Sequence, residues 1–192
     1  MPKQSKNEKP NEIFAGESES HQNLDIDVIR KLLEEIENNV EKVKHLLFIE
    51  NHKKTVNKLK FHNTDEGKIV EGVFDGEEMI ASDGNRYPVP PNYASKSKLV
   101  SGDVLKLTIK TDGTFLFKQI GPVERMKLIG ELKELNGKYV VFAKGKNYNV
   151  LSASLSYYKV SPEDKITIIV PKNAESDWAA IENIIDVNKK EN

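Results

Sequence analysis

The stretch GEEMIASDGNRYPV at residues 76–89 recurs 61 residues later as GKYVVFAKGKNYNV at residues 137–150. The two stretches match at Gly76 and Gly137, Gly84 and Gly145, Tyr87 and Tyr148, and Val89 and Val150. The same offset continues downstream, where it pairs Asp103 with Asp164, Leu107 with Ile168, Phe117 with Trp178 and Ile120 with Ile181. A single register held over so long a stretch predicts an internal duplication, with one copy at residues 67–122 and the other at residues 126–187.

Each copy is predicted to contain five short strands. In the first copy, β-branched and aromatic runs lie at residues 68–74, 77–82, 86–90, 104–110 and 114–120, punctuated by Asp-Gly pairs that favour tight hairpins. The segment between the third and fourth runs is too long for a hairpin, and Ala94–Leu99 within it suits a short helix. This order predicts a small, closed, five-stranded barrel of the OB type, and a small barrel of another topology is the alternative.

The closing half of the first copy, KLVSGDVLKLTIKTDGTFLFKQI at residues 98–120, resembles the OB-fold RNA-binding repeats of the largest bacterial small-subunit ribosomal protein and of exoribonucleases. The matching residues are Val100, Gly102, Asp103, Leu105, Leu107, Ile109 and Asp112. The second copy departs from this pattern with Pro162-Glu163-Asp164. The resemblance implies tandem OB-like barrels that bind RNA. It also implies exposed aromatic residues on the second and third strands, but the second strand of the first copy offers only Met79 and Ile80.

The segment before the repeats divides into three parts. Residues 1–23 are polar and are predicted to be a disordered tail. Residues 24–50 are predicted to form an amphipathic helix with apolar residues alternately three and four positions apart. These residues are Ile26, Ile29, Leu33, Ile36, Val40, Val43 and Leu47. Two interpretations remain open, a helix that packs on the protein's own β-domains and a coiled coil that self-associates. Residues 51–66 are predicted to be a basic linker or a helix extension, and residues 188–192 a polar tail.

Composition limits the class of protein. The 192 residues include 29 basic and 30 acidic side chains and no cysteine. No apolar run is long enough to span a bilayer, and no secretory signal is present, so we expect a cytoplasmic protein without membrane contact. The absence of cysteine excludes disulfides and thiolate metal sites. No nucleophile motif or phosphate-binding loop occurs. We therefore expect a protein that is not an enzyme and that has no cofactor and no metal.

Two functional hypotheses follow. The first is a non-catalytic nucleic-acid-associated protein, binding RNA or single strands through basic groups interleaved with aromatic rings. Its candidate contacts are Lys53, Lys54, Lys58, Lys60, Arg86, Lys96, Lys98, Lys144, Lys146 and Lys159, near Tyr93, Phe142, Tyr157 and Tyr158. The second is a protein-interaction adaptor or scaffold that forms a homo-oligomer through the N-terminal helix or docks a partner protein. Near-neutral charge and scarce arginine favour the second hypothesis.

Overall fold

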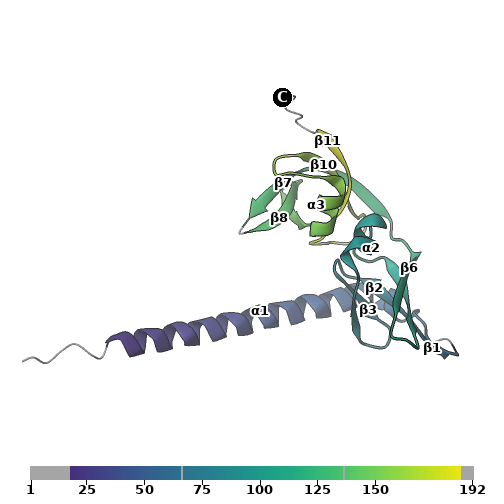
Figure 1. Ribbon diagram of the computed structural model, residues 1–192, viewed down its shortest axis with the longest axis horizontal. Helices are drawn as coiled ribbons and strands as arrows, with labels where there is room; N and C mark the ends of the chain where they lie inside the picture. Colours follow the sequence, from purple (N-terminus) through teal and green to yellow (C-terminus); the bar gives the residue numbers. More distant parts are fainter. Residues whose placement is uncertain (1–17, 66, 136, 187–192) are drawn as a thin grey trace, which may run out of the picture. The chain divides into compact units, whose positions relative to one another are not determined.

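The computed structural model describes residues 18–65, 67–135 and 137–186. Residues 1–17 of the predicted N-terminal tail and the predicted C-terminal tail lie outside this part of the chain. The described chain is mainly β-structure preceded by one long helix, α1 (Ser18–Val56), as the sequence predicts (Figure 1). The first strands are β1 (Phe61–Thr64), β2 (Gly67–Phe74), β3 (Glu78–Ala81), β4 (Arg86–Pro88), β5 (Val104–Lys110) and β6 (Phe115–Gly121), with α2 (Pro91–Lys96) after β4. The later strands are β7 (Arg125–Leu135), β8 (Lys138–Ala143), β9 (Lys146–Asn149), β10 (Lys165–Pro171) and β11 (Ala180–Asp186), with α3 (Ser152–Tyr158) after β9.

The helix α1 is longer than the predicted helix at residues 24–50. It begins at Ser18 and ends at Val56, so it takes in the start of the segment predicted as a linker or helix extension. The described residues form two units, α1 up to Leu47 and the rest of the chain from Phe48 onward. In the second unit Phe48, His52 and Val56 are half-buried and lie four residues apart, on one side of the helix. Burial of that side explains why the helix continues past residue 50.

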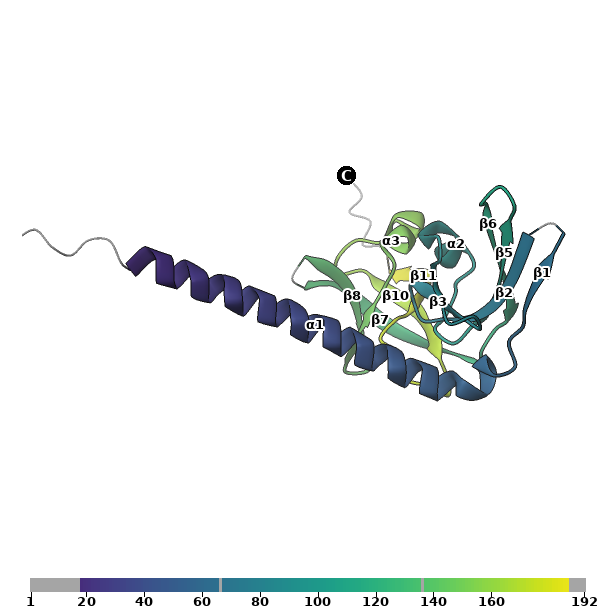
Figure 2. The same ribbon diagram turned by 90° about the horizontal axis from the view of Figure 1, so that it is seen from below.

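The remainder of the predicted linker forms a strand that the sequence did not reveal. β1 pairs antiparallel with β2, with Phe61 opposite Val70 (Figure 2). The backbone N–H of Lys60 donates to Glu71 Oε2 at 2.9 Å, and the N–H of Glu71 donates to the Lys60 carbonyl at 2.9 Å. These reciprocal bonds hold the chain against the first sheet before β1 begins.

The first sheet has the strand order β4-β3-β2-β5-β6, with β1 beside the first half of β2. Along β5 the buried residues Leu105 and Leu107 alternate with Lys106 and Thr108, which are half-buried on the opposite face. A period of two with one buried face is the pattern of an antiparallel sheet that packs on a core from one side.

The second sheet repeats this order as β11-β10-β7-β8-β9. Its buried core residues include Leu132, Val141, Ile166, Ile168 and Ile181. The offset of 61 residues relates β4 to β9 and β5 to β10 but does not hold in the first or the last strand. Gly72, opposite Leu105, corresponds to Gly130, opposite Ile166, which is an offset of 58 residues. Leu107 pairs with Phe117 in the first sheet, whereas Ile168 pairs with Ile181 in the second. Phe117 therefore corresponds to Ile181, and the predicted match of Phe117 with Trp178 is wrong because the loop after β10 is longer than the loop after β5.

The prediction of two closed barrels is wrong, because both sheets are open. In the second sheet a single isolated bridge joins Asn149 at the end of β9 to Trp178. The first sheet has Pro88 at the position of Asn149, and proline has no N–H to donate to a neighbouring strand. The free edge of β6 is partly covered instead by a side chain, since the N–H of Gln119 donates to the Tyr93 hydroxyl at 2.9 Å.

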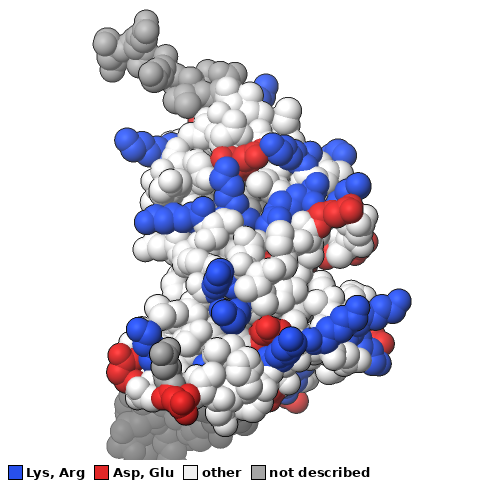
Figure 3. Space-filling model, turned by 90° about the vertical axis from the view of Figure 1, so that its right-hand side faces the viewer, with Lys and Arg blue, Asp and Glu red and all other residues white. Residues whose placement is uncertain are grey.

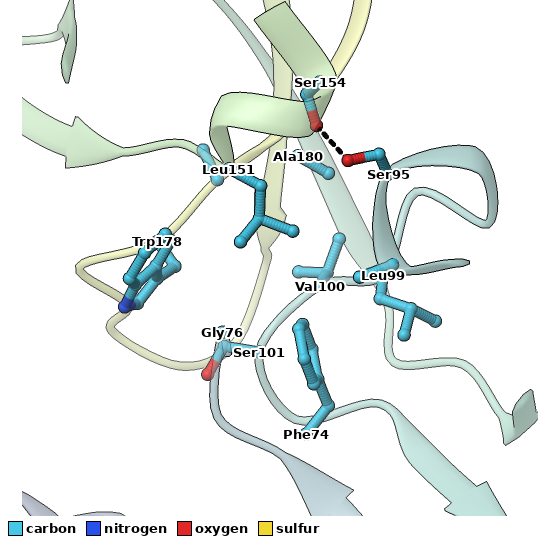
Figure 4. Close-up of a pocket in the computed structure, with 12 residues that line it drawn as sticks. Phe74, Gly76, Ser95, Leu99, Val100, Ser101, Leu151, Ser154, Trp178 and Ala180 are labelled. Atoms are coloured by element: carbon cyan, nitrogen blue, oxygen red, sulfur yellow. Dashed lines mark hydrogen bonds between the residues drawn. The ribbon is translucent and has the colours of Figure 1, made fainter. Parts of the chain in front are cut away.

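The two sheets have separate cores but touch each other. α2 and α3 meet at a buried hydrogen bond of 2.7 Å between the Ser154 and Ser95 hydroxyls. Beside it is a small, largely apolar pocket, shown in Figure 4, whose walls come from both sheets. Phe74 and Leu99 come from the first sheet and its connections, while Leu151 and Trp178 come from the second. The pocket is therefore a packing seam between the sheets.

The Asp103 carboxylate connects the two sheets. Its fully buried carboxylate accepts hydrogen bonds from the backbone N–H groups of Val100 and Val123 at 2.8 and 3.0 Å. Gln119 Nε2 donates to it at 2.8 Å, and the Arg125 guanidinium at 2.7 Å completes an ion pair. Val123 lies in the short connection into β7, and Arg125 is the first residue of that strand. One carboxylate thus ties the start of the second sheet to the interior of the first.

Candidate functional site

The lysine-rich segment after the heptads does not form an extended basic linker. Lys53 and Lys54 lie in the last turn of α1, and Lys58 and Lys60 lie between this helix and β1. Lys53 Nζ forms an exposed ion pair with Glu50 Oε2 at 3.2 Å. Exposed pairs of this kind contribute little to stability and remain open to competition from other anions.

Arg86 is held by two acids of its own sheet. It lies on β4, where its guanidinium contacts Glu78 Oε2 and lies 3.1 Å from Asp75 Oδ2. Both carboxylates are less exposed than the guanidinium itself. Two neighbouring negative charges offset the single positive charge, so Arg86 offers little net attraction for a phosphate.

Three of the candidate lysines lie at the ends of the short helices. Lys96 is in the last turn of α2. Lys98 and Lys159 occupy equivalent places after α2 and α3, with φ of 49° and 54° in the left-handed region. Lys98 Nζ donates to the Glu182 carbonyl at 3.2 Å and lies 6.0 Å from the centroid of the Tyr158 ring. Lys98 therefore bridges from the first sheet to the second.

Lys144 and Lys146 lie together on the β8–β9 hairpin. Lys144 is in the turn with φ of 49°, and Lys146 is the first residue of β9. Lys146 Nζ lies 5.5 Å from the centroid of the Tyr148 ring and 3.0 Å from Asp177 Oδ1 in an exposed ion pair. This hairpin, like the contact of Lys98 with Tyr158, brings a predicted basic residue next to an aromatic ring.

The hairpin also holds Phe142, which the sequence analysis selected, and three residues that it did not select. Phe142 on β8 is 41% exposed, and Tyr139 at the start of β8 is 40% exposed. Lys133 on β7 places its Nζ 4.9 Å from the centroid of the Phe142 ring. Lys138 is exposed beside Tyr139. We call the set Lys133, Lys138, Tyr139, Phe142, Lys144 and Lys146 the β8–β9 surface.

Strand register explains how these residues come together. Phe142 lies opposite Asn147 on β9 and opposite Glu131 on β7, so its ring stands on the outer face between two polar neighbours. Six residues of β8 span about 20 Å, which separates Lys138 at one end from Lys144 at the other. The surface therefore has the length of a short extended segment, with cations at both ends and the exposed Phe142 ring between them. Tyr139, three residues before Phe142, and Lys146, opposite Ala143, project from the other face of the hairpin.

The equivalent hairpin of the first sheet carries the opposite charge. Strand register places Glu77 at the position of Tyr139, next to Lys138. The first hairpin has Asp83 where the second sheet has Lys144. The position of Phe142 is taken by Ile80, which is buried. The two copies thus share a strand order but differ in the surface that they present.

Asp83 belongs to a polar network inside this first hairpin. Its carboxylate accepts hydrogen bonds from Lys68 Nζ at 2.7 Å, the Tyr87 hydroxyl at 2.8 Å and the N–H of Asn85 at 3.0 Å. Burial alone would raise the pKa of Asp83, but the bonds from Lys68, Asn85 and Tyr87 outweigh it and hold that pKa well below its usual range. The same contact raises the pKa of Lys68. Asp83 therefore has a structural role in the first sheet.

We expect Asp83→Asn to lower stability most at neutral pH. A carboxylate whose pKa is lower in the folded protein contributes stability above its unfolded pKa of about 3.9, and that contribution is lost as pH falls through the folded pKa. The gap in urea midpoint between the parent protein and Asp83→Asn should therefore be constant above about pH 5 and should shrink below about pH 4. A gap that widens as the pH falls would contradict the network.

Basic side chains are also found away from this hairpin. On the face drawn in Figure 3, lysine and arginine side chains occur in both halves and are separated by largely uncharged surface. In the first sheet, Lys106 on β5 lies directly opposite Lys118 on β6. Glu71 flanks Lys106 on its other side, and no aromatic ring is paired with either lysine among the described contacts. Lysines and exposed rings coincide on the β8–β9 surface, and also on β1, where Lys68 Nζ lies 4.8 Å from the centroid of the exposed Phe61 ring but is paired with Asp83.

Comparisons with protein families, with characterised proteins and with solved structures find no match to this chain. Within the described ranges no three His, Asp or Glu side chains converge as metal ligands do. Among the same residues, no helix combines the length and apolar composition needed to cross a bilayer.

Proposed function

We propose that this protein binds RNA or another single-stranded nucleic acid, without catalysis, through the β8–β9 surface. The observation that carries the proposal is the Lys133 ammonium 4.9 Å from the centroid of the exposed Phe142 ring, with Lys138 at the start of β8 and Lys144 in the turn directly after it. Single strands are held by cations on the phosphates and by rings under the bases, and this surface offers both.

The strand order supports the proposal. In an OB fold the first strand pairs with the second and the fourth, a helix follows the third strand, and the face of the second and third strands holds oligonucleotides. In the second sheet the corresponding strands are β8 and β9. We therefore propose that each copy is an OB-like domain left open between its third and fifth strands, and that the pair arose by tandem duplication.

The charge contrast between the copies confines the proposed site to the second sheet. A groove shared by both sheets needs positive charge on both, but on the first hairpin Arg86 is surrounded by Asp75 and Glu78. A phosphate backbone approaching that hairpin would meet like charge. The first copy then serves to hold the second copy in place.

Salt-dependent binding tests the proposal. We expect the full chain to bind a labelled single-stranded RNA in fluorescence anisotropy, with log affinity falling linearly against log salt. Replacing Lys138, Lys144 and Lys146 with glutamine should reduce that slope by about 0.7 for each lost phosphate contact. Phe142→Ala should weaken binding by about 1–3 kcal/mol and leave the salt slope unchanged.

A matched control removes the same charge elsewhere. Replacing Lys53, Lys54 and Lys58 with glutamine changes the net charge equally but leaves the β8–β9 surface intact. The proposal requires this control to retain the parent slope. If both triple variants reduce the salt slope by the same amount, binding depends on overall charge and not on the β8–β9 surface. If the parent protein does not bind RNA at low salt, the proposal is wrong.

A second candidate function has its own support. The apolar heptad residues of α1 are exposed, as far as residue 47, in a chain taken alone. We propose that the protein also acts as a self-associating scaffold through this helix. Self-association would multiply the number of β8–β9 surfaces in one particle and would strengthen binding to a long strand through effective concentration.

A further inference from the structure

A continuous apolar stripe runs along the first unit of the protein. Its large apolar side chains are each between 46% and 65% exposed. They are Ile26, Val28, Ile29, Leu32, Leu33, Ile36, Val40, Val43, Leu46 and Leu47. Soluble chains rarely leave a contiguous apolar patch of this kind in water, so the stripe marks an interaction surface.

The stripe has a regular seam with defined ends. In heptad notation the a positions are Ile26, Leu33, Val40 and Leu47, and the d positions are Ile29, Ile36 and Val43. The next d and a positions are Glu50 and Lys54, which are exposed and charged. The seam therefore covers three heptads, a length of about 30 Å, and ends where the second unit begins.

We infer that α1 assembles with copies of itself into a parallel coiled coil of three or four chains. This inference rests on the proposed self-association and adds the number of chains and their direction. The occupant of the stripe is a second copy because every a and d residue is aliphatic. Identical helices in register can therefore form a core without any aromatic or polar mismatch.

The d positions decide the number of chains. Two-stranded parallel coils favour leucine at d with a β-branched residue at a, whereas isoleucine at d favours three or four strands. Here Ile29, Ile36 and Val43 place β-branched residues at every d position of the seam. Leu33 at a precedes Ile36 at d, which is the combination typical of higher-order bundles.

The flanking positions agree with this number. Leu32 and Leu46 occupy g positions, next to the seam, and are 53% and 65% exposed. A two-stranded coil leaves g positions largely in water, whereas a bundle of three or four helices covers more of each helix. The wider stripe is therefore matched by the larger assembly.

The length of the seam decides the direction. In a parallel pair all seven layers face their own copies. An antiparallel pair must set each a residue against a d residue, and the shift that this requires leaves either Ile26 or Leu47 of each helix outside the seam. One such shift would place Arg30 near Glu37 of the other helix, but exposed ion pairs contribute less than a buried aliphatic layer.

The charged residues beside the seam are compatible with a parallel arrangement of the helices. Arg30 pairs with Asp27 of its own helix at 3.0 Å, and Lys44 pairs with Glu41 at 3.0 Å. Both pairs are three residues apart and exposed. These charges are already offset within one helix, so they do not call for an opposite neighbour from an antiparallel chain.

Light scattering of the full chain after size exclusion tests the number of chains. At a high protein concentration, we expect a molar mass three or four times that of one chain. A molar mass of two chains would agree with self-association but would overturn the proposed number of chains. A monomer would overturn both, and neither outcome affects the nucleic-acid proposal, which anisotropy measures independently.

A charge within the seam provides a second readout. Ile36→Lys places an ammonium at a buried d position and should reduce the mass to that of one chain. Asn38→Lys adds the same charge at the outward f position two residues away, and its mass should equal that of the parent. An Ile36→Lys protein that stays folded in its β unit, by near-ultraviolet circular dichroism, and remains oligomeric would overturn the seam.

Cysteine cross-linking tests the direction without interference, because the chain has no native cysteine. In a parallel bundle Ile29→Cys faces its own copy, so mild oxidation should give a covalent dimer from this single variant. In the antiparallel registers Ile29 faces Val40 or Leu47, and only a mixture of Ile29→Cys with Val40→Cys or Leu47→Cys should cross-link. The second pattern would overturn the parallel arrangement.

Discussion

Replacing Asp103 with alanine should lower the free energy of unfolding by about 3–5 kcal/mol, the scale of breaking a buried ion pair from one side. The substitution leaves the Arg125 guanidinium without its carboxylate. It also leaves the N–H groups of Val100 and Val123 and the Gln119 amide without an acceptor. Because Asp103 ties the connection into β7 to the first sheet, both sheets should lose stability together. Urea unfolding followed by intrinsic fluorescence measures the effect.

The repeat itself supplies the control for this substitution. Asp164 stands in the same place in the second sheet, where it accepts one hydrogen bond, from the N–H of Ser161 at 2.8 Å. It is half-buried and takes part in no recorded ion pair of the described residues. Asp164→Ala should therefore cost about 1 kcal/mol. Equal losses for Asp103→Ala and Asp164→Ala would show that Asp103 does not hold the sheets together.

Gly76→Ala should destabilise the protein by about 3 kcal/mol, through backbone strain and a steric clash. Gly76 has a φ of 133°, a conformation that side chains disfavour. A Cβ at this position would overlap the Trp178 side chain, which belongs to the other sheet. Thermal or urea unfolding measures the loss. A second substitution, Trp178→Ala, should recover part of it in the Gly76→Ala protein because it removes the clash.

Gly84→Ala separates strain from steric clash. Gly84 also has a positive φ, 81°, but a Cβ there would have no heavy atom within 4 Å. Its substitution should cost about 1 kcal/mol, the scale of a strained backbone alone. If Gly76→Ala costs no more than Gly84→Ala, Trp178 does not pack against the β2–β3 turn as described.

The sequence predicted the strands well because each strand carries its own signal. Leu105 and Leu107 alternate with polar residues, and Asp75-Gly76 and Asp83-Gly84 mark the turns, so the period and the punctuation agree. The helix α1 was predicted equally well, from its heptad pattern. Predictions of this kind rest on neighbouring residues, and neighbouring residues are what a single sequence provides.

The closure of the sheets could not be predicted in the same way. Whether a third strand meets a fifth depends on backbone groups that are far apart in the chain. Pro88 was visible in the sequence, but its consequence follows only once its position is seen to match that of Asn149, which bonds across to the segment before β11. The strand β1 was missed for a related reason, because FHNT has no alternation and owes its pairing to β2.

The candidate site was predicted in part. Lys144, Lys146 and Phe142 were selected from sequence as basic and aromatic residues, and the structure places them on one hairpin. Lys133 and Lys138 were passed over because they lie in a run of mixed charge. Their relation to Phe142 comes from strand register, which places Lys133 and Lys138 on the same face as that ring. The two carboxylates around Arg86 were likewise unreadable, since only folding brings Asp75 and Glu78 to it.

Ultraviolet cross-linking tests the central claim most directly, because it reports where a single strand lies. A short uridine-rich RNA is irradiated with the full chain at low salt, and cross-linked peptides are mapped by mass spectrometry. The account predicts that cross-links fall on residues 137–149, at Tyr139 or Phe142, and disappear in the Lys138, Lys144 and Lys146 triple variant. Cross-links confined to the first sheet, or none at all, would contradict it.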